Sequence, residues 1–122
     1  EPADARARVR ETLALMGADI ICHPSNLVLP NCPDSMPVRC LENRVFAVTS
    51  NRIGTEARGG KEPLTFIGNS EVVSPRGVML HRAPRDREEL AVVDIDPTEA
   101  RNKQVTRYND LLAGRRPELY RR

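Results

Sequence analysis

The sequence predicts an α/β fold, in which a mixed β-sheet is covered by helices on one face. Three observations support this prediction. Apolar residues repeat at helical spacing near the N-terminus, several short apolar and β-branched runs have the length of strands, and helices alternate with strands only in the first half of the chain. Early alternation favours parallel strands, whereas the later succession of strands favours antiparallel pairing.

The first helix is predicted over residues 4–16. Val9, Leu13 and Met16 recur at steps of four and three residues, as on one side of a helix. Gly17 follows, and glycine is the usual residue just beyond the end of a helix.

Prolines divide the next part of the chain. The apolar run of residues 19–22 predicts a buried strand, which Pro24 is expected to end. Residues 25–37 contain three further prolines and are predicted to form a loop with about one helical turn at most. A short helix is predicted over residues 38–43, and the β-branched run of residues 45–50 predicts a second buried strand.

The later elements are short and are separated by glycine or proline. Each is predicted from an apolar run or a turn signal. In order, they are a polar loop over residues 54–63, strands over 65–67 and 70–74 with a break at Gly68 and Asn69, a turn at 75–77, a returning strand over 78–81, a strand over 90–95, and a helix that begins at Pro97 with Asp96 or Thr98 as its cap.

The composition excludes several classes of protein. The chain has 122 residues, enough for one domain, and its 19 Lys and Arg residues balance 17 Asp and Glu residues. This balance disfavours both a basic nucleic-acid domain and an acidic tail. Because no apolar run is long enough to span a membrane, no membrane partner is expected. Three cysteines without a Cys-x-x-Cys pair predict no disulfide framework and favour a reducing, cytoplasmic location.

The C-terminal segment is the most basic part of the chain. Residues 101–122 contain seven basic and two acidic residues. Nucleic-acid surfaces interleave basic with aromatic residues, and only Tyr108 and Tyr120 are aromatic here. We therefore expect residues 97–122 to form a tail that is solvated or contacts another subunit, and not to bind nucleic acid.

Polar residues follow the first predicted strand, where ligands commonly bind in α/β sheets. Ser25 and Asn26 lie there, and the Asn26 amide can both donate and accept hydrogen bonds to an amide or carboxylate. The alternative is that both side chains only satisfy the backbone of their loop. His23 is expected to be a packed, hydrogen-bonded side chain and not a base.

The cysteines do not have the spacing of a metal site. Zinc ligands usually come in pairs two to four residues apart, and Cys22, Cys32 and Cys40 do not. Cys22 and His23 are neighbours on a predicted strand, so their side chains point to opposite faces and form no nucleophile pair. No metal or cofactor is expected.

Charged residues flank the second predicted strand. Burial of this strand requires partners for them. The simplest interpretation is that Arg44 or Arg52 forms an ion pair with Glu42 or Glu56. The alternative is that these residues, with their polar neighbours Asn43 and Asn51, line a pocket.

Seven segments, taken in order, resemble the nitrilase superfamily of carbon–nitrogen hydrolases. No single segment is decisive, but the ordered set extends from Thr12 to Tyr120. The segments are LALMGADII (13–21), HPSNLVLP (23–30), MPVRCLENRVF (36–46), NRIG (51–54), FIGNS (66–70), ARNK (100–103) and RRPELY (115–120).

The resemblance implies an α-β-β-α sandwich that hydrolyses non-peptide C–N bonds. In the family, a Glu acts as general base, a Lys stabilises the oxyanion and a Cys is the nucleophile. The resemblance places the nucleophile near Glu1, where no cysteine is present, and residues 1–11 match poorly. The chain is therefore expected to be the C-terminal half of the sandwich, a partial domain over residues 1–122 with no catalytic residue.

The resemblance also implies a substrate-binding role for Ser25, Asn26 and Leu27. The expected substrate is a small amide or nitrile, with amide or carbamoyl compounds favoured, and the expected assembly is a homo-oligomer. Two alternatives remain open. The chain could be an inactive homologue or truncated product that acts by association, or an enzyme that uses Cys22 or Cys40.

Overall fold

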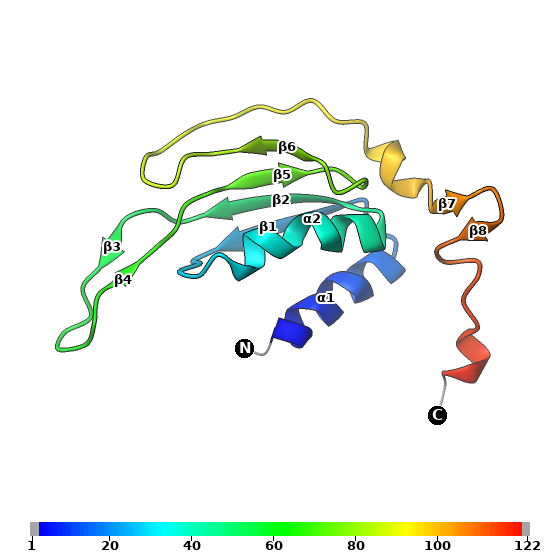
Figure 1. Ribbon diagram of the computed structural model, residues 1–122, viewed down its shortest axis with the longest axis horizontal. Helices are drawn as coiled ribbons and strands as arrows, with labels where there is room; N and C mark the ends of the chain where they lie inside the picture. The colour runs from blue at the N-terminus through cyan, green and yellow to red at the C-terminus, as the bar shows by residue number, and fades with distance from the viewer. Residues whose placement is uncertain (1–2, 121–122) are drawn as a thin grey trace.

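A four-stranded mixed sheet forms the centre of the computed structural model, which describes residues 3–120 (Figure 1). The strands are β1 (Ile20–Ser25), β2 (Phe46–Asn51), β5 (Glu71–Val73) and β6 (Met79–Arg82), in the order β1-β2-β5-β6. β1 is parallel to β2, whereas β2–β5 and β5–β6 are antiparallel. The predicted mixed sheet is confirmed, including its change from parallel to antiparallel pairing.

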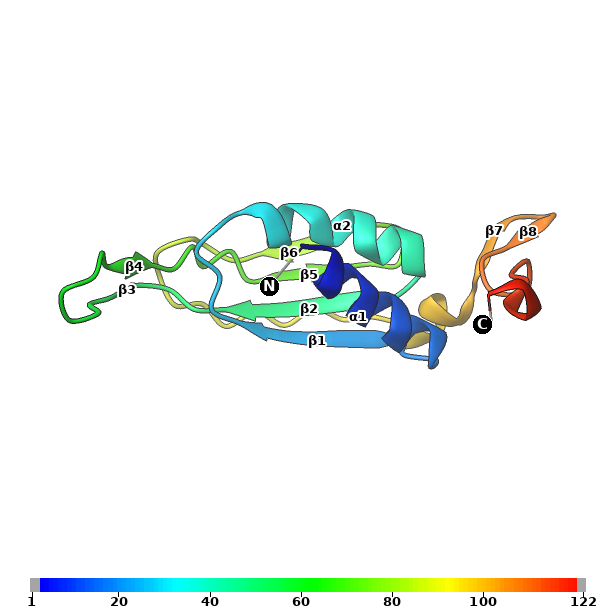
Figure 2. The same cartoon turned by 90° about the horizontal axis from the view of Figure 1, so that it is seen from below.

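Both α-helices, α1 (Ala3–Leu15) and α2 (Asn31–Asn43), lie on the same face of the sheet (Figure 2). Two buried clusters fill the space between the helices and the sheet. Cys32, Met36 and Cys40 of α2 pack against Ala47 and Val73, and Ala14 packs against Ile21 and Val45. The core therefore lies between the sheet and its one helical layer.

The helix α2 is longer than predicted. It begins at Asn31 and contains Pro33 and Pro37, so the expected loop over residues 25–37 is wrong for its second half. Pro33 lies in the first turn, where its missing N–H costs no helical hydrogen bond. The helix persists through Pro37 because Met36 and Cys40, each only 1% exposed, bury this side of α2.

The strand β1 continues through Pro24, which was expected to end it. β1 is at the edge of the sheet, and Pro24 pairs with Ser50 of β2. An edge strand has backbone groups that face away from any partner, so a residue without an N–H fits there.

A short hairpin extends the structure beyond the end of β2 (Figure 1). It consists of β3 (Thr55–Glu56) and β4 (Leu64–Thr65), paired antiparallel. The strand predicted over residues 65–67 thus begins one residue earlier, ends at Thr65 and belongs to this hairpin and not to the main sheet. The predicted turn at residues 75–77 is confirmed, and Gly77 there has a φ of 72°.

The strand predicted over residues 90–95 is wrong. No strand is assigned there, and Leu90 and Val92 are 93% and 86% exposed. The apolar run alone indicated a buried strand, but a strand also requires a partner, and none of the described residues pairs with this segment.

The C-terminal region lies beyond one end of the sheet (Figure 1). It contains η1 (Pro97–Arg101), β7 (Gln104–Thr106), β8 (Asn109–Asp110) and η2 (Pro117–Leu119). The helix predicted at Pro97 is the 3₁₀ helix η1, and its cap is Asp96, whose carboxylate accepts a hydrogen bond from the Thr98 N–H at 2.9 Å.

Three contacts attach this region to the sheet and α2. Ala100 is fully buried, and Arg101 forms a 3.0 Å ion pair with Asp19. The Lys103 ammonium donates hydrogen bonds to the carbonyls of Asn43 and Arg44 at the end of α2. The contact with another subunit remains a prediction. Arg121 and Arg122 of the basic tail lie outside the described residues, as does Glu1.

The helix α1 is confirmed, but its apolar pattern does not face the core. Val9, Leu13 and Met16 are exposed, whereas Arg10 and Ala14 are buried. No helix in the described part of the chain is both long and apolar enough to cross a membrane.

Candidate functional site

The predicted site residues lie at the carboxyl end of β1, beside the carboxyl end of the parallel strand β2. Ser25 is the last residue of β1 and pairs with Asn51 of β2. Asn26 follows and is exposed, and its side chain makes no hydrogen bond within the described residues. The polar group of Asn26 is therefore available to a ligand.

The other two predicted residues have internal contacts. The Ser25 hydroxyl lies 2.9 Å from Nε2 of His23, and His23 Nδ1 lies 3.2 Å from the Thr49 hydroxyl. The Leu27 side chain packs partly buried against the core cluster of α2. The expectation that His23 is a hydrogen-bonded, packed side chain agrees with these contacts. A substrate-binding role for Ser25, Asn26 and Leu27 stays a prediction.

Asn51 links the loops at this edge of the sheet, and the sequence indicated it only as one of the polar residues that flank the second strand. Its Oδ1 accepts a hydrogen bond from the Leu27 N–H at 2.7 Å, and its Nδ2 donates to the Gly68 carbonyl at 2.7 Å. The Asn51 backbone N–H donates to the Ser70 hydroxyl at 2.9 Å. The sequence could have pointed to Asn51, because this asparagine directly follows the buried run of residues 45–50 and so lies at the same edge as Asn26.

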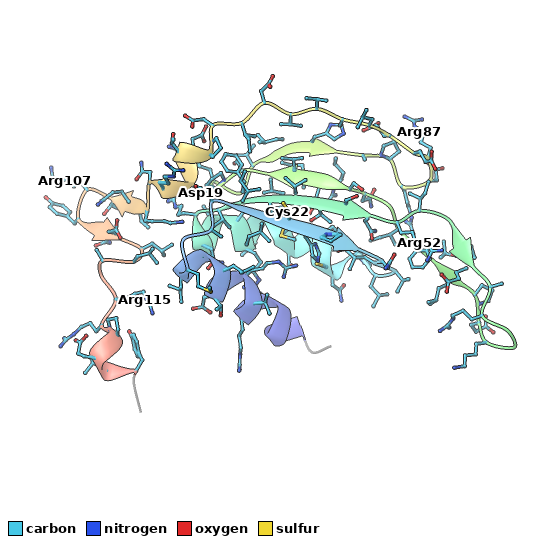
Figure 3. All side chains as sticks on the ribbon, turned by 180° about the vertical axis from the view of Figure 1, so that it is seen from behind. Asp19, Cys22, Arg52, Arg87, Arg107 and Arg115 are labelled. Carbon is cyan, nitrogen blue, oxygen red and sulfur yellow. The ribbon has the colours of Figure 1, made fainter. Side chains whose placement is uncertain are left out.

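A polar cavity of about 320 Å³ lies at the same edge. Asn51 lines it, together with residues of β2, of the loop before β5 and of the segment after β6. The lining residues are Ser50, Asn51, Ile53, Ser70, Ala83, Pro84, Arg87, Glu88 and Glu89. Figure 3 shows Arg87 and Arg52 at this end of the sheet, far from Asp19 at the other end.

Arg52 has two side-chain contacts at this edge of the sheet. Its guanidinium forms a 2.6 Å ion pair with Glu56 and lies 4.3 Å from the centroid of the Phe66 ring. The predicted Arg52–Glu56 pair is confirmed. Glu42 pairs instead with Arg39, at 2.8 Å, one helical turn away on α2.

A row of polar side chains crosses the sheet beneath the helices. His23, Thr49, Glu71 and Arg82 are aligned across the four strands. The Glu71 side chain is fully buried, and burial raises the pKa of its carboxyl even though Arg82 lies 2.9 Å away. Glu71 Oε1 has no hydrogen-bond partner in the described part of the chain. This row packs against the helical layer, and none of its residues lines the cavity.

The three thiols have different surroundings. Cys32 is buried, and its sulfur accepts a hydrogen bond from the Arg10 guanidinium at 3.3 Å. Cys22 is exposed and lies on the opposite face of β1 from His23, as predicted from their adjacency. Cys40 is buried, and burial together with the charge of Glu71 raises the pKa of its thiol to about 12, so it stays protonated at neutral pH. Among the described residues, no three His, Cys, Asp or Glu side chains are placed to hold a metal ion.

The sequence is similar to proteins that are named as nitrilases and amidases. The chain is 48% identical over 109 residues to a nitrilase of Pyrococcus abyssi, covering 89% of this chain and 40% of that protein. It is 32% identical over 134 residues to an N-carbamoylputrescine amidase of Oryza sativa subsp. japonica, covering 98% of this chain and 42% of that protein. The chain thus spans about two fifths of the length of these relatives.

Solved structures show the same fold. A carbon–nitrogen hydrolase from Helicobacter pylori G27 superposes with a TM-score of 0.74 at 24% identity, over 93% of this chain and 43% of that one. An amidase from Nesterenkonia sp. AN1, with the acetamide moiety of fluoroacetamide on its active-site cysteine, superposes with a TM-score of 0.67 at 26% identity, over 93% of this chain and 38% of that one. A sequence model of the carbon–nitrogen hydrolase family matches residues 7–104. The chain belongs to the carbon–nitrogen hydrolase family, within the nitrilase superfamily.

Proposed function

We propose that the protein hydrolyses non-peptide C–N bonds of amide or carbamoyl compounds, and that this chain supplies a wall of the substrate pocket and not the catalytic groups. The observation on which this rests is the amide of Asn26, which is exposed and has no hydrogen bond within the described residues, at the carboxyl edge of two parallel strands. An amidase with an acetamide adduct and an N-carbamoylputrescine amidase among the similar proteins support amide and carbamoyl substrates, whereas the relative at 48% identity is named a nitrilase and keeps nitriles as the alternative.

The chemistry of Asn26 matches such a substrate. A primary amide offers one carbonyl acceptor and two N–H donors, and the Asn26 side chain offers the complementary set. In this role Asn26 orients the substrate carbonyl while groups outside this chain attack it. The buried, protonated thiol of Cys40 disfavours the alternative in which this chain provides its own nucleophile.

The first test is ammonia release from acetamide, from an N-carbamoyl amine and from acetonitrile. The 122-residue chain alone is expected to hydrolyse none of them. A longer protein that also contains the family's catalytic groups, here called the full-length protein, is expected to hydrolyse the first two, and iodoacetamide is expected to abolish this activity. Turnover by the 122-residue chain that iodoacetamide abolishes would contradict the assignment of roles.

A matched pair of asparagine variants tests the role of Asn26. In the full-length protein, Asn26→Ala is expected to raise KM for acetamide about tenfold, because it removes hydrogen bonds to the substrate. Asn109→Ala, which truncates an exposed asparagine of the C-terminal hairpin, is the control and is expected to leave KM unchanged. Equal KM values in both variants would remove Asn26 from the pocket.

A second candidate function, association without catalysis, is favoured by the exposed apolar segment at Leu90 and Val92. Such surfaces promote protein contacts. The isolated chain is expected to self-associate, and we propose a homo-oligomer with contacts from residues 97–122. Light scattering at high concentration tests this, and a clean monomer would count against it. The free thiols of Cys22, Cys32 and Cys40 fit a reducing cytoplasm, the location we propose.

A further inference from the structure

The loop that holds Asn26 has a fixed backbone on both sides of that residue. The Arg52 N–H donates to the Ser25 carbonyl at 3.1 Å, before Asn26. After it, the Leu27 N–H donates to Asn51 Oδ1 at 2.7 Å, and the Leu27 carbonyl accepts from the Ile67 N–H at 3.0 Å. The direction of the Asn26 side chain therefore depends on a few hydrogen bonds to the backbone of this loop, in which only one side chain takes part.

That side chain is Asn51, and its two amide ends have different partners. The Leu27 N–H is a donor and requires the carbonyl oxygen of Asn51, whereas the Gly68 carbonyl is an acceptor and requires the NH₂ group. Both distances are 2.7 Å, and Nδ2 also lies 3.5 Å from the Leu27 carbonyl. Among ordinary side chains of this size, only an amide satisfies both partners at once.

Asn51 also lies between this loop and the cavity, which residues 25–27 do not line. It lines the 320 Å³ cavity, and so does Ser70, whose hydroxyl accepts a hydrogen bond from the Asn51 N–H. Asn51 thus touches the loop of Asn26, the loop of Gly68 and the wall of the cavity. No other described side chain is hydrogen-bonded to both loops.

We propose that Asn51 is the positioning residue of the substrate pocket, which holds the loop of residues 25–27 so that Asn26 faces the substrate. This inference rests on the proposed function, because it takes Asn26 to be the group that touches the substrate. Asn51 itself acts through the backbone of Leu27 and Gly68. Its loss affects recognition of the amide before it affects the fold.

The test uses Asn51→Asp in the full-length protein. At pH 7 the aspartate has two acceptor oxygens, so one of them faces the Gly68 carbonyl without a proton between them. Hydrogen exchange at the Leu27 amide is expected to be at least about tenfold faster than in the wild type, and KM for acetamide is expected to rise about tenfold. As the pH falls toward 4, the carboxyl gains a proton and again offers one donor and one acceptor. The exchange rate at Leu27 and the KM for acetamide, each divided by the wild-type value at the same pH, are then expected to return toward one.

Two further variants separate positioning from a general loss of stability. Leucine has a similar size but no polar side-chain atoms, so Asn51→Leu is expected to show faster exchange at Leu27 and a raised KM at every pH. Asn51→Ser, a smaller change, replaces Asn51→Asp if that variant does not fold. Asn43→Asp is the matched control, because the Asn43 amide donates to the Arg39 carbonyl at 2.9 Å on α2, away from the pocket. It is expected to lower stability and to leave KM unchanged.

Wild-type exchange at Leu27 together with a wild-type KM in Asn51→Asp at pH 7 would overturn the inference. A faster exchange and a raised KM in Asn51→Asp that persist at low pH would also overturn it. The loss of the paired donor and acceptor of Asn51 would then not be their cause. If the wild-type protein hydrolyses no amide, the proposed function is wrong, and the exchange measurement at Leu27 still decides whether Asn51 holds the loop.

Discussion

Replacing Gly68 with alanine is expected to lower the free energy of unfolding by about 3 kcal/mol. Gly68 has a φ of 57°, and the left-handed region costs an alanine roughly 1 kcal/mol. Its Cβ would lie 2.3 Å from the carbonyl oxygen of Arg85 and 2.9 Å from that of Pro84. Overpacking of this kind typically costs 1–3 kcal/mol. Relief requires movement of the backbone at Pro84, which accepts a hydrogen bond from the Asn69 N–H.

Gly54→Ala is the matched control for this prediction. Gly54 also has a positive φ, 84°, but no atom lies within 4 Å of the position of its Cβ. Gly54→Ala is expected to lower the free energy of unfolding by about 1 kcal/mol, because only the left-handed backbone conformation disfavours the alanine. Urea unfolding of both variants gives the difference directly. Equal losses in the two variants would refute the close approach of residues 84 and 85 to Gly68, and with it the geometry of the loop that Asn51 binds.

Three further outcomes are expected. Lys103→Met removes the two hydrogen bonds that cap the end of α2 and is expected to lower stability by about 1 kcal/mol in urea unfolding; an unchanged midpoint would show that this contact does not anchor the C-terminal region. Because burial raises the pKa of Glu71 in the folded state, its contribution to stability is present below the ordinary pKa of a glutamate and is lost as the pH rises through the raised value. Glu71→Gln is therefore expected to remove this part of the pH dependence, and Arg82 then keeps Asp34, 3.7 Å away, as a charged partner; the same slope in both proteins would contradict this. In the folded protein at pH 7, a maleimide is expected to label Cys22 and to leave Cys40 unmodified, as mass spectrometry of digested protein can show, and rapid labelling of Cys40 would contradict its burial.

Much of the fold is predictable because local patterns and tertiary structure agree. The helix near the N-terminus, the buried run that becomes β2 and the hairpin turn at residues 75–77 all appear where the sequence indicates. The exceptions occur where tertiary context outweighs a local signal. Pro24 lies within an edge strand, and Pro37 lies within a helix whose packing offsets the lost hydrogen bond.

The site was predictable only in part for a similar reason. Asn26 could be proposed as a candidate from its place after an apolar run, because ligands bind at the carboxyl ends of strands in such sheets. The linking role of Asn51 could not, because its partners Leu27 and Gly68 are 24 and 17 residues away in the sequence. A sequence indicates that an asparagine follows a strand, but it does not indicate which loops meet it.

The amino-acid sequence by itself determined the family and the mixed sheet with its helical layer. These depend on residue types and local order, which a sequence states directly. Only the tertiary structure decided that Asn51 joins two loops beside a cavity, that Glu71 and Arg82 pair beneath the helices, and that residues 90–95 have no strand partner among residues 3–120. Those features depend on contacts between distant segments, and their energies arise only when the chain brings the segments together.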